Sequence, residues 1–135
     1  MDHPSGDLKE RSKSFAIRVV RVVRSLPSSA ECRVIGNQLL RAATSVAANY
    51  RAVCRARSRP EFLAKLGIVI EETDEAAFWL EFLVDIGLIA ESKLNDLISE
   101  ANQLVAIFNA SRVTAKKGSH STINNQNSTI SSRRA

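Results

Sequence analysis

The sequence predicts an all-α protein that folds as an antiparallel up-down-up-down four-helix bundle. Apolar residues recur at three-, four- and seven-residue spacing in four segments, and Ser, Pro or Gly residues separate these segments. Five Gly and three Pro in 135 residues are too few for the many tight turns of a sheet protein, and abundant Ala, Leu and Arg favour helix. A chain of this length supports one domain with a sizeable core.

The first half of the chain contains two predicted helices. One covers about 8–25, begins with an acidic capping pattern and ends before Pro27. Ser28 and Glu31 have the spacing of a capping box, which begins a second helix over about 29–57. The predicted core residues share one face of each helix. They are Leu8, Phe15, Val19, Val22, Leu26, Ile35, Leu39, Ala42, Val46 and Val53.

The second half repeats this organisation. Ser58 and Glu61 form a capping box for a helix over about 59–86, Gly87 suits a left-handed cap, and a fourth helix covers about 92–114. The predicted core residues are Phe62, Leu66, Val69, Thr73, Ala76, Leu80, Leu83, Leu94, Leu97, Ile98, Ala101, Leu104, Val105 and Phe108. Short loops between four helices require neighbours to run in opposite directions.

The two ends of the chain differ in composition from the bundle over 7–115. Residues 1–6 read as a disordered leader and residues 116–135 as a disordered basic tail, because the tail is rich in Ser, Thr, Asn and Gln and has few apolar groups to offset its ordering entropy. No segment has the pattern of a secretory signal, and charges interrupt each apolar run before the roughly 18 residues of a spanning helix. We expect a soluble, cytoplasmic protein without a membrane span.

Charge is distributed unevenly. Residues 1–58 carry 11 basic and 4 acidic groups, residues 59–115 carry 4 and 10, and the tail adds four cations. At 100° per residue, three arginines of each basic helix lie within an arc of about 80°. They are Arg11, Arg18 and Arg21 on the first helix and Arg41, Arg51 and Arg55 on the second. Because a guanidinium binds phosphate through two parallel donors, these six are the candidate nucleic-acid-binding residues.

Three interpretations of these stripes stay open. They bind nucleic acid, RNA rather than DNA, or a nucleic-acid enzyme. Alternatively they belong to a structural, scaffolding homo-oligomer in which charges only pair subunits, with Glu71, Glu72, Glu75, Glu81 and Asp85 as partners. In the third interpretation, the basic first helix attaches to an anionic membrane surface. Base-specific readout is not expected, because no helix-turn-helix, zinc-finger or aromatic stacking motif is present.

No catalytic or metal-binding motif accompanies the stripes. Glu72 and Glu75 have i, i+3 spacing, but a di-iron bundle needs Glu-x-x-His motifs, and His3 and His120 lie in the predicted disordered ends. The sequence has no Gly-rich phosphate loop, nucleophile elbow or Cys-x-x-Cys pair. We therefore expect a non-enzymatic protein that uses no cofactor and no metal.

One segment carries a family resemblance. Gln38–Arg51 (QLLRAATSVAANYR), followed by Ser58–Phe62 and a Phe-Trp-Leu triplet in the third helix, resembles the 23S rRNA intervening-sequence proteins. The resemblance extends from about Phe15 to Phe108. It implies a four-helix bundle that assembles into homopentamers around an axial passage. An apolar flank on the third helix suits such a contact, and it consists of Ile68, Phe78, Trp79, Phe82 and Ile86.

The same family includes the accessory subunit of diversity-generating retroelements. The resemblance therefore implies RNA, or a nucleic-acid enzyme such as a reverse transcriptase, as a partner, although no activity follows from the name of most members. The positions that match the family's recurrent residues are Asn49, Tyr50, Arg51, Glu72, Glu75 and Trp79. Ala47 and Ala52 depart from the usual Gly and Glu. We predict that the Asn49 amide bonds to one of the two matched carboxylates on the third helix.

Overall fold

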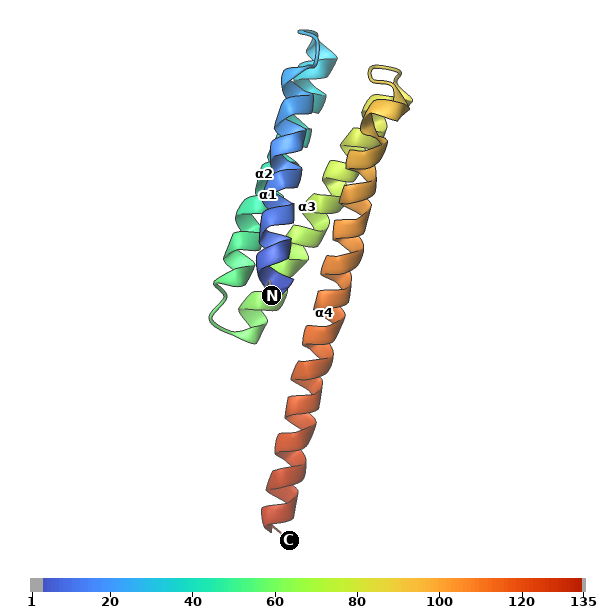
Figure 1. Ribbon diagram of the computed structural model, residues 1–135. Helices are drawn as coiled ribbons and strands as arrows, with labels where there is room; N and C mark the ends of the chain where they lie inside the picture. Colours follow the sequence, from blue (N-terminus) through green and yellow to red (C-terminus); the bar gives the residue numbers. More distant parts are fainter. Residues whose placement is uncertain (1–3, 135) are drawn as a thin grey trace.

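The computed structural model describes the backbone of residues 4–134 and the side chains of residues 8–118. This part of the chain folds into α1 (Pro4–Arg24), α2 (Ala30–Cys54), α3 (Arg59–Asp85) and α4 (Glu91–Arg134). Consecutive helices run in opposite directions and lie side by side (Figure 1). The predicted all-α, up-and-down bundle is confirmed.

Serine caps begin α2 and α3. Ser29 accepts a hydrogen bond from the Cys32 amide at 3.1 Å, one residue after the expected cap at Ser28. Ser58 accepts from the Glu61 amide at 3.2 Å, as predicted. Each bond satisfies an N–H group that has no carbonyl partner in the first turn of its helix. Both α2 and α3 therefore begin at defined residues.

Gly87 ends α3. Its φ of +75° lies in the left-handed region, where a Cβ is strained. The Gly87 amide donates to the Val84 carbonyl at 2.9 Å, and the Leu88 amide donates to the Leu83 carbonyl at 3.0 Å. These two bonds form a Schellman motif, so the predicted capping role of Gly87 is confirmed.

The core is built from the predicted apolar stripes. Large side chains from all four helices are fully buried, among them Phe15, Val19, Leu39, Val46, Leu66, Val69, Leu80, Leu83, Leu104 and Phe108. Ser12 and Thr73 are also fully buried, and each hydroxyl donates to a carbonyl four residues earlier at 2.6 Å. Extensive contacts join α1 to α2, α2 to α3 and α3 to α4, whereas α1 meets α4 lightly.

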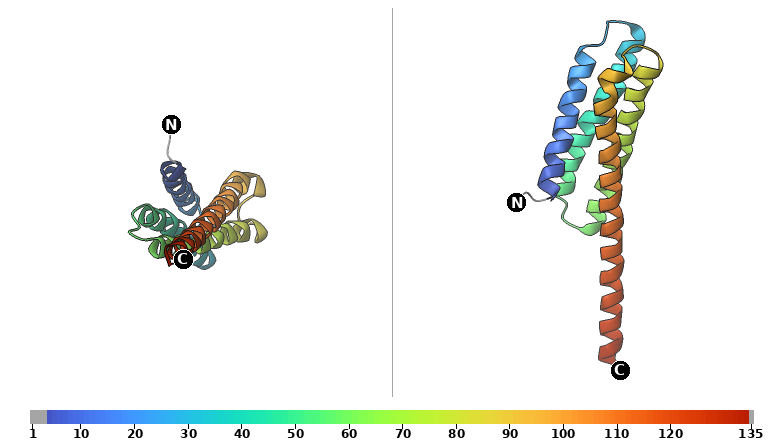
Figure 2. Two further views of the ribbon diagram at one scale, coloured as in Figure 1. Left: turned by 90° about the horizontal axis from the view of Figure 1, so that it is seen from below. Right: turned by 45° about the vertical axis from the view of Figure 1, so that its right-hand side comes forward.

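Two helices are longer than expected. α1 already includes residues 4–6, which were assigned to the leader, while residues 1–3 lie outside the described part. α4 continues to Arg134, past the expected end near residue 114, and extends beyond the other three helices (Figure 2). Lengthening an existing helix needs no new nucleus, so a backbone can continue as helix without the packing that a separate helix would need.

One end of the bundle contains several chain segments. The start of α1, the loop between α2 and α3, and the projecting part of α4 all lie toward this end (Figure 1). The α1–α2 and α3–α4 loops lie at the opposite end (Figure 1). None of the described helices is long and apolar enough to cross a membrane.

Candidate functional site

Arg11, from the predicted stripe on α1, faces α4. Its Nη2 lies 2.6 Å from Glu100 Oε1, and its Nε donates to Glu100 Oε2 at 3.2 Å. This two-pronged ion pair links the two helices that otherwise touch lightly. Arg18 is partly buried and Arg21 is exposed on the same side of α1. The stripe therefore lies toward α4, and Arg11 already has a carboxylate partner within the chain.

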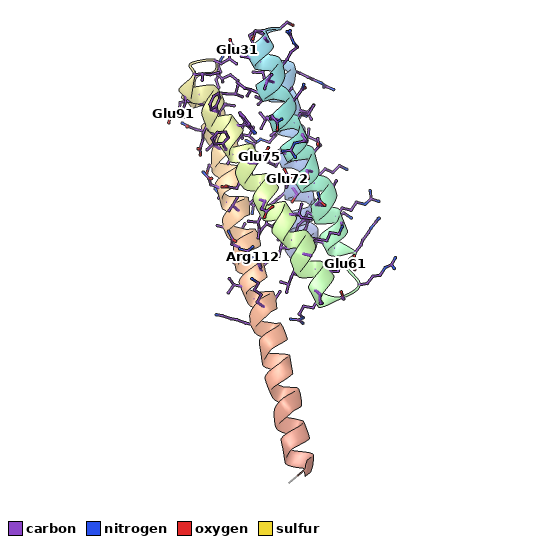
Figure 3. All side chains as sticks on the ribbon, turned by 180° about the vertical axis from the view of Figure 1, so that it is seen from behind. Glu31, Glu61, Glu72, Glu75, Glu91 and Arg112 are labelled. Carbon is purple, nitrogen blue, oxygen red and sulfur yellow. The ribbon has the colours of Figure 1, made fainter. Side chains whose placement is uncertain are left out.

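Arg41 connects α2 to α3. Its Nη1 lies 3.2 Å from both carboxylate oxygens of Glu72, and its Nη2 donates to Glu75. Figure 3 shows Glu72 and Glu75 on the side of α3 that faces α2. The hydrogen bonds to Glu75 and Glu72 raise the pKa of Arg41 above its usual value. Pairing that the sequence suggested between subunits thus occurs within one chain.

Asn49 does not make the predicted bond to Glu72 or Glu75. Its Nδ2 donates to the Ser45 carbonyl and to Ser45 Oγ, both at 2.9 Å. The prediction was wrong because Arg41 binds the two carboxylates, while the shorter Asn49 side chain satisfies its amide one turn back on its own helix.

Tyr50 and Trp79 of the family motif have packing roles. The Tyr50 ring, 5% exposed, stacks on Phe108 of α4 with a centroid distance of 5.2 Å. Burial, together with a smaller effect of the Cys54 thiol, raises the pKa of Tyr50 to about 12. Trp79 Nε1 donates to Glu75 at 3.2 Å, and its ring meets Phe78 edge to face at 4.9 Å. Tyr50 therefore joins α2 to α4, whereas Trp79 makes these contacts within α3 and packs partly buried against the core.

Arg51 and Arg55 lie together near the end of α2. They line an open hollow of about 620 Å³, here called the basic hollow. Its lining residues are Ala48, Arg51, Ala52, Arg55, Arg57, Glu61 and Lys65. Arg57 from the loop and Lys65 from α3 add two cations that the stripes did not include. Small alanine side chains on α2 leave space for a ligand backbone to approach.

A second hollow lies beside the first, between α1 and α2. It measures about 420 Å³ and is lined by Lys9, Glu10, Lys13, Ala47, Ala48 and Arg51. Because Ala48 and Arg51 line both hollows, the two form one continuous surface across α1, α2 and the start of α3. We call its six cations the basic surface. They are Lys9, Lys13, Arg51, Arg55, Arg57 and Lys65.

The six cations of the basic surface outnumber the two carboxylates that line the same hollows, Glu10 and Glu61. Ion pairs among the described side chains involve Arg11 and Arg41 as the cations and none of the six. Glu61 lines the basic hollow, and its carboxylate accepts a hydrogen bond from the Arg57 backbone amide at 3.2 Å without pairing with a guanidinium or ammonium group of the described side chains. The positive end of the α3 helix dipole adds to the local potential. The arrangement favours an anionic ligand.

Sequence reasoning missed Lys9, Lys13, Arg57 and Lys65. The four-residue spacing of Lys9 and Lys13 places them on one face of α1, and that face borders the core stripe on the side opposite Arg11. Their proximity to Arg51 depends on which side of α1 packs on α2, and helical periodicity does not contain that information. A search limited to arginine stripes could not find this surface.

An apolar groove lies between the start of α3 and α4. It measures about 910 Å³. Its lining residues are Ala56, Arg57, Ser58, Arg59, Phe62, Ile107, Ala110, Ser111, Thr114, Ala115 and Gly118. Arg59 Nη1 donates to the Ala115 carbonyl at 2.8 Å and so connects α3 to α4. Arg57 lines both this groove and the basic hollow.

These features define a small helical-bundle protein with a basic, open surface at one end. Within the described residues, no three His, Cys, Asp or Glu side chains gather in a way that could hold a metal ion. The chain belongs to the 23S rRNA-intervening sequence protein family, whose model matches residues 6–110.

A solved structure gives the same fold. It is a protein of unknown function from Bacteroides thetaiotaomicron VPI-5482, described as a member of the S23 ribosomal protein family. The two chains are 28% identical and superpose with a TM-score of 0.73, over 78% of this chain and 97% of that one. No curated protein matches this chain.

Proposed function

We propose that this protein is a non-enzymatic, oligomeric binding protein that holds RNA through its basic surface. The observation that carries the proposal is a continuous set of six cations, none with a carboxylate partner among the described side chains. Phosphate groups supply the missing anions, and their release of counterions drives association. The choice of RNA over DNA is part of the proposal, and a DNA duplex measured in parallel tests it.

The chemistry of the surface favours contact with the nucleic-acid backbone. Its three arginines present planar donors that fit phosphate oxygens, and its three lysines contribute mobile point charges. Alanines lie between these cations, and no aromatic ring lines the basic hollow or the second hollow beside it. Binding there is accordingly independent of sequence, because phosphate contacts position a ligand while base contacts specify it.

The proposal divides the six arginines of the two sequence stripes by role. Arg51 and Arg55 bind phosphate. Arg11 and Arg41 hold helices together through Glu100 and the α3 carboxylates. Arg18 and Arg21 line neither the basic hollow nor the second hollow, and they stay predicted phosphate contacts on α1.

The first test is fluorescence anisotropy of a structured RNA with the triple variant Arg51→Ala/Arg55→Ala/Arg57→Ala. We expect at least a tenfold loss of affinity. For the unaltered protein, a plot of log affinity against log salt should have a slope of about −5 if six phosphates are neutralised. The matched control, Arg24→Ala/Arg33→Ala/Lys93→Ala, removes the same charge from exposed positions near the other end of the bundle.

Two results would contradict the proposal. Equal losses in both triple variants would show a response to net charge instead of a defined surface. Absence of RNA binding at low salt would remove direct binding altogether and favour a protein partner, such as a nucleic-acid enzyme with an acidic face. A DNA duplex of the same length, measured in parallel, tests the preference for RNA.

The oligomer of this proposal is a homopentamer assembled through the outer face of α3. Phe78 is 53% exposed, Ile86 is 45% exposed and Ile68 is 40% exposed. These three side chains recur along one helix and leave apolar area in contact with water, which is typical of a surface that a partner covers. The basic surface adjoins this face at Lys65, one turn from Ile68 on α3, and its other five cations lie on α1, α2 and the loop after α2.

A further inference from the structure

We propose that the apolar groove receives an unpaired base of the RNA whose backbone lies on the basic surface. The preferred ligand is then a duplex that continues into a single-stranded nucleotide. This inference rests on the proposed function and adds the class of RNA that the protein distinguishes.

Continuity between the two places supports the proposal. Arg57 lines both the basic hollow and the apolar groove, which lie on either side of the first turn of α3. Its side chain is exposed, and its backbone amide, not its guanidinium, is the group bonded to Glu61. A phosphate held by Arg57 would therefore place the next nucleotide at the mouth of the groove.

The lining of the groove suits a nucleobase. Phe62 and Ile107 are partly buried and present apolar surface, and Ser111 and Thr114 bring hydroxyl groups that can bond to a base edge. A volume of about 910 Å³ lies within the range of small-molecule sites. Recognition of unpaired RNA commonly uses a ring on which the base stacks, and the basic surface has none.

Arg59 gives the groove a second planar group. Its guanidinium is fixed by the bond to the Ala115 carbonyl, and a Cβ on Gly118 would lie 2.8 Å from its Nη1. The plane therefore approaches α4 closely at the end of the groove near Gly118. Stacking of a base on an arginine plane is a recurrent mode of contact with unpaired nucleotides. Phe62 and Arg59 thus offer stacking surfaces within one groove.

The experiment compares two RNA hairpins with the same stem, one blunt and one with a short 3′ overhang that contains 2-aminopurine. The full chain should bind the overhang RNA at least fivefold more tightly, and 2-aminopurine fluorescence should change on binding. In Ala110→Phe, which fills the groove, this preference should disappear while blunt-hairpin affinity is unchanged. Ala106→Phe is the control, because Ala106 is exposed on α4 and does not line the groove.

Each outcome has a distinct meaning. Equal affinity of the unaltered protein for both hairpins overturns the groove proposal and leaves backbone binding intact. A preference that survives Ala110→Phe, with both variants melting normally, also overturns it, since the overhang would then be bound elsewhere. If neither hairpin binds at low salt, the proposed function fails, and this inference fails with it.

Discussion

Tyr50 illustrates how burial decides the behaviour of a single polar residue. Its ring packs between α2 and α4 against Phe108, and burial is the largest cause of its raised pKa of about 12. The unfolded chain releases this proton near pH 10, whereas the folded chain retains it up to about pH 12. Folding is therefore favoured fully below pH 10, and this contribution is lost as the pH rises toward 12.

We predict that the unaltered protein loses stability relative to Tyr50→Phe between pH 9.5 and pH 12. The relative loss should be on the order of 2 kcal/mol, because a pKa difference of one unit corresponds to about 1.4 kcal/mol. Urea unfolding at several pH values measures it. The comparison is clean because the chain contains one tyrosine. Parallel stability curves for the two proteins would show that the ionised ring is tolerated in the fold.

Residue partners were the least predictable part of the site. Arg41 and Asn49 lie on the same helix, and the sequence favoured Asn49 as the partner of Glu72 or Glu75. The structure pairs them with Arg41, whose long side chain reaches from the exposed face of α2 to α3. Which of two donors on one helix binds a carboxylate on the next helix depends on side-chain length and interhelical distance. Neither quantity can be read from helical periodicity.

At the scale of elements, helix ends were predictable where a specific cap exists. Ser58 and Gly87 end or begin helices through hydrogen bonds that their residue types make possible. No such signal follows the packed part of α4, so its predicted end relied on composition alone. The helix runs on to Arg134 instead. The composition of a segment indicates how stable its helix is, but it does not indicate the residue at which the helix ends.

We predict that amides of residues 119–134 exchange with solvent far faster than those of the packed part of α4. The projecting helix extends beyond the other three, and its Ser- and Asn-rich sequence gives little intrinsic helix stability. Hydrogen exchange followed by mass spectrometry measures this, with the segment around the fully buried Leu104 as the internal reference. Strong protection beyond residue 119 would instead indicate that another copy or ligand packs on it.

At the scale of the whole molecule, the bundle carries two surfaces of different character. The basic surface lies at the end where α2 passes into α3, and the exposed apolar flank lies along α3. The charge asymmetry and the apolar flank were visible in the sequence, but of the six cations of the basic surface only Arg51 and Arg55 were singled out from it. The placement of the two surfaces relative to each other required the packing of α1 and α3 on α2.

If the proposed oligomer forms through the outer face of α3, we predict that Phe78→Ser shifts the protein to smaller species. The ring is 53% exposed in a single chain, so its replacement should change assembly much more than folding. Sedimentation velocity measures the distribution of species. Val113→Ser is the matched control, because Val113 is 50% exposed on α4 and outside the α3 flank. An unchanged distribution in Phe78→Ser would exclude this face as the contact.

The position of the start of α1 has a practical consequence. Lys9 and Lys13 lie in the early turns of α1, so anything fused ahead of α1 emerges beside the basic surface. A polyhistidine tag there would add imidazoles to the same region, and at mildly acidic pH their charge would raise apparent RNA affinity and mask the loss caused by arginine variants. A fluorophore or affinity handle inserted near Pro27 avoids this interference, because that loop lies at the opposite end of the bundle.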